Sequence, residues 1–215
     1  MAQGKAGEEL PEEPGRRQQV LDAALAIADE KGLDAVTMRA VAARVGVTAM
    51  ALYPHDSSKD DLLDGLVGRL LAELSLPDTA RPWPDRLREI ARSALEAAGR
   101  HPALMPLVFT RPAVTPEAVR VVEAIYQALL DAGVPDAEVA RVERMVSTFV
   151  LGYAISGGRF AARDPEQRRA LLAGEDLPAH RRLAAELQAP HSAKAEFEAA
   201  LDDLTGLIET IASRS

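Results

Sequence analysis

The residues best suited to contact another molecule lie in a short stretch that follows Gly46. A helix that begins at Thr48 must end by Tyr53, because Pro54 disfavours helical geometry in the residue before it. Such a helix would present small or apolar side chains and then two ring side chains, namely Thr48, Ala49, Met50, Ala51, Tyr53 and His55. A helix with this tip can enter a DNA major groove about 12 Å wide, where alanine, threonine and methionine contact thymine methyl groups.

Two helices are predicted before this stretch and one after it. Apolar residues recur at three- and four-residue spacing over 16–31, and Gly32 ends that helix. Thr37 is a good N-cap for a second short helix, which ends at Gly46, where a missing Cβ permits a tight turn. Ser58 begins a Leu-rich helix. The pattern predicts a helix-turn-helix unit, although an ordinary helical hairpin has the same kind of turn.

The rest of the chain also reads as helix, because Ala, Leu, Glu and Arg dominate between breakers and no segment alternates strictly. A proline-rich linker over 76–84 precedes helices expected at about 85–99, 102–110, 116–132, 136–162 and 192–213, with a short one near 179–188. We therefore predict an all-α protein. Its expected parts are a disordered tail (1–15), a helix-turn-helix domain with its connecting helix (16–75) and a larger helical domain (76–215).

The composition of the chain excludes several kinds of site and of protein. The chain has no cysteine, which excludes disulfides and thiolate metal sites, and no apolar run approaches the ~20 residues that cross a bilayer. We expect a cytoplasmic protein. The net charge of -8 is unusual for a DNA-binding protein, but residues 16–59 carry six basic and five acidic side chains, so the acidity lies mostly elsewhere.

Two long helices are candidates for a dimer interface. The 136–162 helix is apolar on more than one side, and the last helix repeats apolar residues at steps of four and three. We expect a four-helix contact between two protomers. Its predicted residues are Val146, Val150, Phe197, Leu201, Leu204, Ile208 and Ile211.

The few aromatic and methionine side chains of the chain lie mostly on the helices between the linker and the predicted dimer face. Met105, Phe109, Tyr126, Met145, Phe149 and Tyr153 are predicted to line a largely apolar ligand pocket, with His101, Arg111 and Arg159 as polar anchors. The same side chains would equally fit an ordinary core.

The run LDAVTMRAVAARVGVTAMALYPHDSSKDDLLDGLV resembles the N-terminal DNA-binding domain of the tetracycline-repressor (TetR) family of bacterial transcriptional regulators, over roughly residues 16–75. The resemblance implies a homodimeric repressor that binds a pseudo-palindromic double-stranded operator and is released by a small-molecule effector. Arg39 would then reach a guanine edge or a phosphate, and Thr37 and Lys59 would bind phosphates. Thr48, Ala49, Met50 and Ala51 would face bases, and Tyr53 and His55 would contact the DNA backbone. Pro54 and Asp56 depart from the family pattern, and the acid there weakens attraction to DNA.

Two other classes of function are alternatives to a repressor. An enzyme would need a motif that is missing: the four histidines have no metal-ligand spacing, no Gly-rich phosphate loop occurs, and Ser156 lacks a nucleophile-elbow context. We expect no catalytic residues, no metal and no cofactor. A helical interaction module without DNA contact is the other alternative, and salt-dependent DNA binding distinguishes the repressor from it.

Overall fold

The computed structural model describes residues 14–52, 58–111, 115–156, 176–188 and 192–214. No strand occurs within these ranges, and the predicted all-α fold is confirmed. The α-helices are α1 (Pro14–Lys31), α2 (Met38–Val45), α3 (Lys59–Leu71), α4 (Trp83–Arg100), α5 (Met105–Thr110), α6 (Pro116–Asp131), α7 (Asp136–Ser156), α9 (Pro178–Arg182) and α10 (Ala193–Ala212). Short 3-10 helices are η1 (Leu33–Ala35), η2 (Ala49–Leu52), η3 (Pro102–Leu104) and η4 (Glu186–Gln188).

Side-chain caps fix the starts of several helices where the sequence predicts them. Thr37 accepts a hydrogen bond from the backbone N–H of Ala40, and Ser58 accepts one from that of Asp61. Thr115 caps α6 through the N–H of Ala118, directly before the proline at the first helical position. Each hydroxyl satisfies a backbone donor that the first helical turn leaves without a partner.

The predicted helix over 48–53 is wrong in type. The described part of this stretch is the single 3-10 turn η2, in which the Ala51 N–H donates to the Thr48 carbonyl over 3.0 Å. A segment of this length before Pro54 has little room for the i to i+4 bonds of an α-helix, so the tighter i to i+3 turn forms instead. The predicted helix over 136–162 is described as far as Ser156, and its remainder lies outside the described residues.

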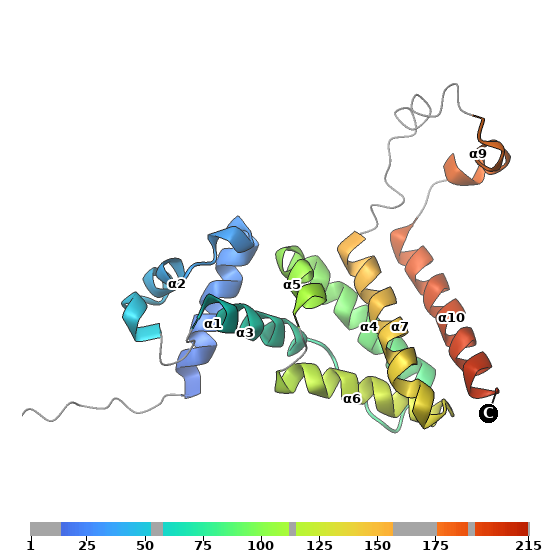
Figure 1. Ribbon diagram of the computed structural model, residues 1–215, viewed down its shortest axis with the longest axis horizontal. Coiled ribbons are helices and arrows are strands. Elements are labelled where there is room, and N and C mark those ends of the chain that lie inside the picture. Colours follow the sequence, from blue (N-terminus) through green and yellow to red (C-terminus); the bar gives the residue numbers. More distant parts are fainter. Residues whose placement is uncertain (1–13, 53–57, 112–114, 157–175, 189–191, 215) are drawn as a thin grey trace, which may run out of the picture.

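The helices form an elongated molecule with α1, α2 and α3 at one end and α4, α6, α7 and α10 at the other (Figure 1). The first hydrophobic cluster spans α1, α2 and α3 but also takes in buried side chains that follow the linker: Ala97, Ala98, Leu104, Met105 and Leu107. The second joins α4, α6, α7 and α10, and the third is Ala91, Val150, Phe197 and Leu201. Because the first hydrophobic cluster joins the two ends of the molecule, a movement of α4 or α5 would shift side chains that pack against α3.

None of the helices in the described ranges combines the length and the apolar character needed to span a membrane.

Candidate nucleic-acid interface and ligand cavities

The turn after α2 positions η2. Gly46 has φ of 79°, in the left-handed region that residues with a Cβ rarely adopt. Its N–H and that of Val47 both donate to the Ala42 carbonyl, which closes the helix and reverses the chain. A methyl group at Gly46 would meet no atom within 4 Å, so the backbone conformation and not the available space requires glycine here.

The η2 turn is anchored on one side and open on the other. Leu52 is 1% exposed in the first cluster, whereas Met50 is 76% exposed. Thr48 and Ala51 are exposed as well. Ala49, predicted to face outward, is half-buried and packs against the first cluster. Three of the four predicted base-facing residues therefore point away from the protein.

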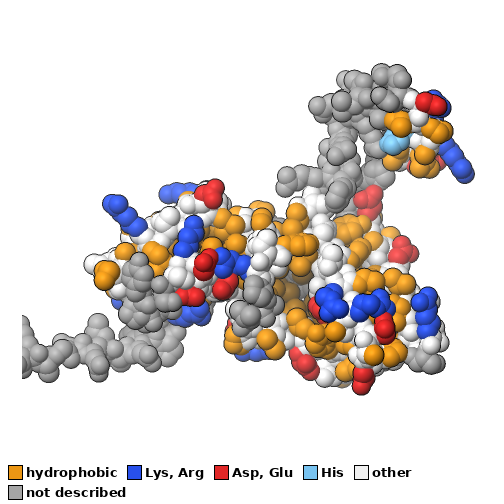
Figure 2. All heavy atoms as spheres, in the orientation of Figure 1, with side chains coloured by type: hydrophobic (Ala, Val, Ile, Leu, Met, Phe, Trp, Pro, Cys, Tyr) orange, Lys and Arg blue, Asp and Glu red, His pale blue; other side chains and the backbone are white. Residues whose placement is uncertain are grey.

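Polar groups suited to phosphate lie on the same unit. Thr37 is exposed, and because its oxygen accepts the helix-capping bond, its hydroxyl hydrogen is left to donate outward. Arg39 and Lys59 are exposed and have no carboxylate partner in the described part of the chain. Figure 2 shows Lys and Arg side chains along one edge of this end of the molecule. Tyr53 and His55 lie outside the described residues.

Other charged side chains near this surface form ion pairs within the protein. Arg44 donates to Glu30 over 2.8 Å, and this hydrogen bond lowers the pKa of Glu30 and raises that of Arg44. Asp60, beside Lys59, accepts from Arg111 over 2.6 Å. The Arg111 guanidinium offsets the Asp60 charge, which would otherwise repel a phosphate at the start of α3.

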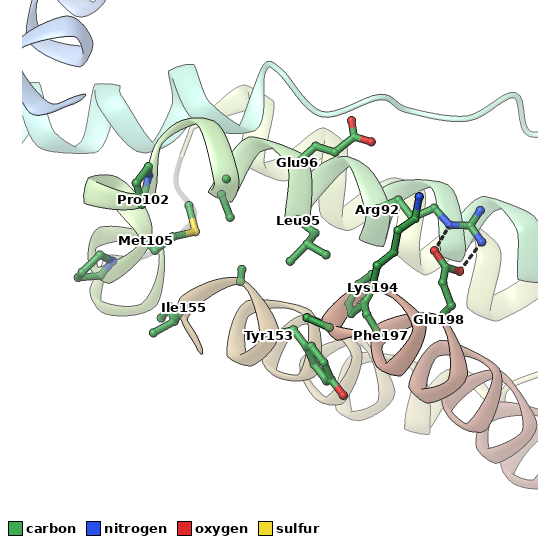
Figure 3. Close-up of a pocket in the computed structure, with 15 residues that line it drawn as sticks. Arg92, Leu95, Glu96, Pro102, Met105, Tyr153, Ile155, Lys194, Phe197 and Glu198 are labelled. Atoms are coloured by element: carbon green, nitrogen blue, oxygen red, sulfur yellow. Dashed lines mark hydrogen bonds and ion pairs between the residues drawn. The ribbon is translucent and has the colours of Figure 1, made fainter. Parts of the chain in front are cut away.

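An outer cavity of about 860 Å³ lies between α4, α5, α7 and the start of α10. Figure 3 shows Leu95 of α4 facing Tyr153 of α7 and Phe197 of α10 across it. The Tyr153 and Phe197 rings meet edge to face with centroids 5.2 Å apart. At one end of the cavity Arg92 donates to Glu198 over 2.8 Å and 2.6 Å, and Lys194 stands beside this pair.

The predicted pocket residues are divided between this cavity and the core. Met105 and Tyr153 line the outer cavity. Phe149 stacks on Phe197 and tilts against Tyr153, behind the cavity wall. Tyr126 and Met145 pack against the second cluster, and Phe109 is 47% exposed and lines neither cavity.

The two predicted anchors that the structure describes, His101 and Arg111, connect the two ends of the molecule and line neither cavity. His101 places one ring nitrogen 2.8 Å from Asp29 of α1 and the other 3.2 Å from Glu73, just after α3. Burial alone would raise the pKa of Glu73, but Arg100, His101 and Arg69 together lower it. Arg111 binds two carboxylates of α3. Arg159 lies outside the described residues.

A second, inner cavity of about 200 Å³ is lined by residues of α4, α6 and α7 and by Leu71 and Leu74 at the end of α3. Its wall is aliphatic except for Glu143 and Ser147 of α7. Sequence reasoning missed Glu143, although its position supplied a signal: Glu143 follows Val139 by four residues and precedes Val146 by three, on the buried stripe of the helix.

The residues predicted for the dimer face belong to the interior of one protomer, which corrects that prediction. Six of the seven are buried without any partner chain, and Leu204 is half-buried. The apolar seam of α10 packs against α4 and α7 of its own chain, in the second and third clusters. A regular apolar repeat shows that a face is covered but not which helix covers it.

Comparison with known proteins identifies two matching family models. The one described as "Bacterial regulatory proteins, tetR family" matches residues 20–66. The one described as "Tetracyclin repressor-like, C-terminal domain" matches residues 76–209. The two matches cover the helix-turn-helix unit and most of the remaining helices.

Individual relatives agree with the family models. The chain is 31% identical to the transcriptional repressor DrrR1 of Streptomyces coeruleorubidus over 73% of its own length and 58% of that relative. It is 31% identical to an HTH-type transcriptional regulator of Saccharopolyspora erythraea over 72% of its own length and 66% of that relative. The chain thus spans somewhat less than two thirds of each. ActR of Streptomyces coelicolor, solved with actinorhodin, shares the fold with a TM-score of 0.80 at 23% identity, over 93% of this chain and 99% of that one.

Proposed function

The chain belongs to the TetR family of bacterial transcriptional regulators, and we propose that it is a ligand-responsive repressor that binds a pseudo-palindromic operator as a homodimer. The observation that carries the proposal is the η2 turn, in which buried Leu52 holds Met50 at 76% exposure on an end of the molecule that carries exposed basic side chains. A long apolar side chain exposed in this way, beside basic residues, fits the floor of a major groove.

The proposed DNA contacts divide by chemistry. Met50, Thr48 and Ala51 read base edges and thymine methyl groups, with Ala49 behind them as a spacer. Thr37, Arg39 and Lys59 bind phosphates and set the register, and Arg39 is also able to reach a guanine edge. Tyr53 and His55 are proposed to contact the DNA backbone beyond η2.

Dimerisation supplies the specificity that one short turn lacks, because two reading elements about 34 Å apart meet two half-sites. With the predicted seam buried inside the protomer, we propose that the outward faces of α7 and α10 form the four-helix contact. On α10 that face carries the exposed residues Ala199, Asp203, Gly206, Leu207 and Thr210. On α7 it carries Ala140, Arg144 and Thr148. Small side chains on this face allow the helices to approach closely.

The outer cavity is the proposed effector site, and the effector is largely apolar because aromatic and aliphatic side chains dominate the wall. ActR, which shares this fold, was solved with actinorhodin. An effector that binds better to a state with displaced reading elements weakens operator binding by the same free energy, typically ~1–3 kcal/mol. The shift would pass through Met105, which lines the cavity and is also part of the first core.

The proposed domain boundaries remain a tail over 1–15, a DNA-binding domain over 16–75 and an effector-binding domain over 76–215. The match of the second family model from residue 76 supports the division. Because an operator lies on bacterial DNA, we also propose that the protein works in the cytoplasm, without a cofactor.

A mobility-shift assay tests this function. The purified full-length chain is titrated onto DNA from upstream of its own gene, with and without apolar candidate effectors, beside Met50→Ala. We expect a salt-sensitive protein–DNA complex whose affinity Met50→Ala lowers about tenfold. One of the candidate effectors should dissociate the complex. A chain that binds no DNA at low salt would favour the helical interaction module instead. Unchanged affinity of Met50→Ala would contradict the role proposed for the η2 turn.

A further inference from the structure

The side chain of His101 lies between two carboxylates that belong to different elements. His101 directly follows α4, and its side chain is 13% exposed. Its Nδ1 lies 2.8 Å from Asp29 of α1, and its Nε2 lies 3.2 Å from Glu73, two residues after the end of α3. Each ring nitrogen therefore lies within hydrogen-bond distance of a group that, when ionised, only accepts.

The protonation state of the ring decides whether both contacts are favourable. A neutral imidazole has one N–H donor and one lone pair, whereas a protonated imidazole donates through both nitrogens. Only the protonated ring can donate to Asp29 and Glu73 together, because the neutral ring turns a lone pair toward one of the two carboxylates. The C-terminal end of α4, where His101 lies, also favours a positive charge.

The charges around the histidine balance when its ring carries the second proton. Glu73 also accepts from Arg100 over 3.0 Å and from Arg69 over 3.3 Å. Arg69 donates in turn to Asp22 of α1 over 2.8 Å. No lysine or arginine pairs with Asp29 in the described part of the chain, and η3, which packs against α1, has no titratable side chain. The two arginines therefore face three carboxylates, and the protonated ring supplies the third positive charge.

We propose that His101, Asp29 and Glu73 form a proton-controlled clamp. With its second proton, the ring fixes α1 and the end of α3 against the end of α4, and the clamp loosens when that proton is lost. Histidine ordinarily changes its charge between about pH 5 and 8, a range in which carboxylates and arginines ordinarily stay charged.

The clamp joins the two functional ends of the molecule. Helices α1 and α3 belong to the proposed DNA-reading unit, whereas α4 lines the outer cavity. The pH would therefore set how freely the reading unit moves relative to the helices around the proposed effector site. This consequence rests on the proposed function, but the clamp itself does not, so it can be tested without DNA and without an effector.

Thermal melts of the full-length protein at about pH 6 and about pH 8 test the clamp. A histidine that gains anionic partners on folding adds stability in acid, and this contribution is lost as the pH rises. We expect His101→Gln to lower the Tm by about 2–4 °C more at the acidic pH than at the basic one. His180→Gln is the matched control, because His180 is exposed and has no partner in the described residues. An equal effect of His101→Gln at both pH values would overturn the proposal.

A double-mutant cycle ties the effect to the contact with Asp29. The Tm shifts of His101→Gln and Asp29→Asn should add up to more than the shift of the double variant, because each removes the same hydrogen bond. This departure from additivity should be larger at the acidic pH, at which the ring donates through both nitrogens. A departure that is equal at both pH values, or absent at both, would contradict the clamp.

The distance between two spin labels measures the loosening directly. Because the chain has no cysteine, Ala43→Cys on α2 and Gln127→Cys on α6 provide two exposed labelling sites. An excess of unlabelled chain restricts the measured distances to one protomer. We expect the distance distribution to be broader at the basic pH, and His101→Gln to make it broad at both.

A width that does not change with pH in the wild-type chain, or that changes equally in His101→Gln, would overturn the proposal. A failed mobility shift beside an intact pH-dependent clamp would count against the proposed repressor alone.

Discussion

The guanidinium of Arg111 donates to the carboxylate of Asp64 over 2.6 Å and thereby joins the end of α5 to the middle of α3. Arg111 also donates to the Asp60 side chain over 2.6 Å and to the Asp60 carbonyl over 3.1 Å. These hydrogen bonds raise the pKa of Arg111. The helix α3, which leads from the proposed DNA-reading unit, is thus held by the segment next to the outer cavity.

The first prediction concerns this contact. Arg111→Ala should reduce the effect of the effector on operator affinity by about threefold or more, because coupling requires an element that both sites bias. The measurement is the ratio of operator Kd values with and without saturating effector. Arg120→Ala is the matched control, since Arg120 is exposed and has only a 3.8 Å contact with Glu117. An unchanged ratio in Arg111→Ala would contradict the role given to this contact.

The second prediction concerns the place where α6 meets α3. A Cβ at Gly68 would lie 2.9 Å from Cγ2 of Thr115, a branched side chain that also caps α6. Gly68→Ala should therefore destabilise the protein by about 1–3 kcal/mol, despite the better helix propensity of alanine. Urea denaturation measures the change. Gly99→Ala, where nothing lies within 4 Å, should be neutral or stabilising by up to about 1 kcal/mol.

The third prediction separates phosphate contacts from base contacts. Lys59→Ala should lower the slope of log K against log salt concentration by about 2 for a dimer, since each phosphate contact contributes about 0.9. The loss of affinity should be nearly uniform over operator variants. Lys194→Ala, at the outer cavity, should leave the slope unchanged. A sequence-dependent loss in Lys59→Ala would assign Lys59 to base recognition instead.

The fourth prediction concerns pH. The hydrogen bond from Arg92 lowers the pKa of Glu198 below its ordinary 4.5, against the opposing effect of burial. A carboxylate with a depressed folded-state pKa stabilises the protein fully above its unfolded pKa, and this contribution is lost as the pH falls through the folded pKa. Glu198→Gln should therefore cost about 0.5 kcal/mol at pH 7.

Denaturation curves at neutral and acidic pH check this. The difference between Glu198→Gln and the wild-type chain should shrink as the pH falls below about 4.5. Glu209→Gln, an exposed carboxylate on the same helix, serves as the control and should show little difference at either pH. A penalty for Glu198→Gln that grows toward low pH would contradict the account of the ion pair.

Local signals made much of the fold predictable from the sequence. Thr37, Gly46 and Thr115 act through their own backbone neighbours, so their types alone placed three helix boundaries. The η2 turn was harder, because a segment of so few residues before Pro54 is compatible with either helix type. Which of the two forms depends on packing around Leu52.

The predictions that the structure corrects concern residues whose surroundings depend on which helices pack together. The spacing of Phe197 and Ile208 on α10 identified a buried face, but the choice between a partner chain and α4 and α7 of the same chain depends on tertiary structure. His101 and Arg111 were expected to be polar anchors of a ligand pocket. Their partners are 72 residues away at Asp29 and 47 away at Asp64, a separation that local patterns do not reveal.

In the proposed dimer, two η2 turns read one operator together. Hydroxyl-radical footprinting of the full-length protein on its operator tests this directly, with Met50→Ala for comparison. We predict two protected stretches related by two-fold symmetry, with centres about one helical turn or a whole multiple apart, and weaker protection of both by Met50→Ala. A single asymmetric footprint, or a symmetric one that Met50→Ala leaves unchanged, would contradict the account.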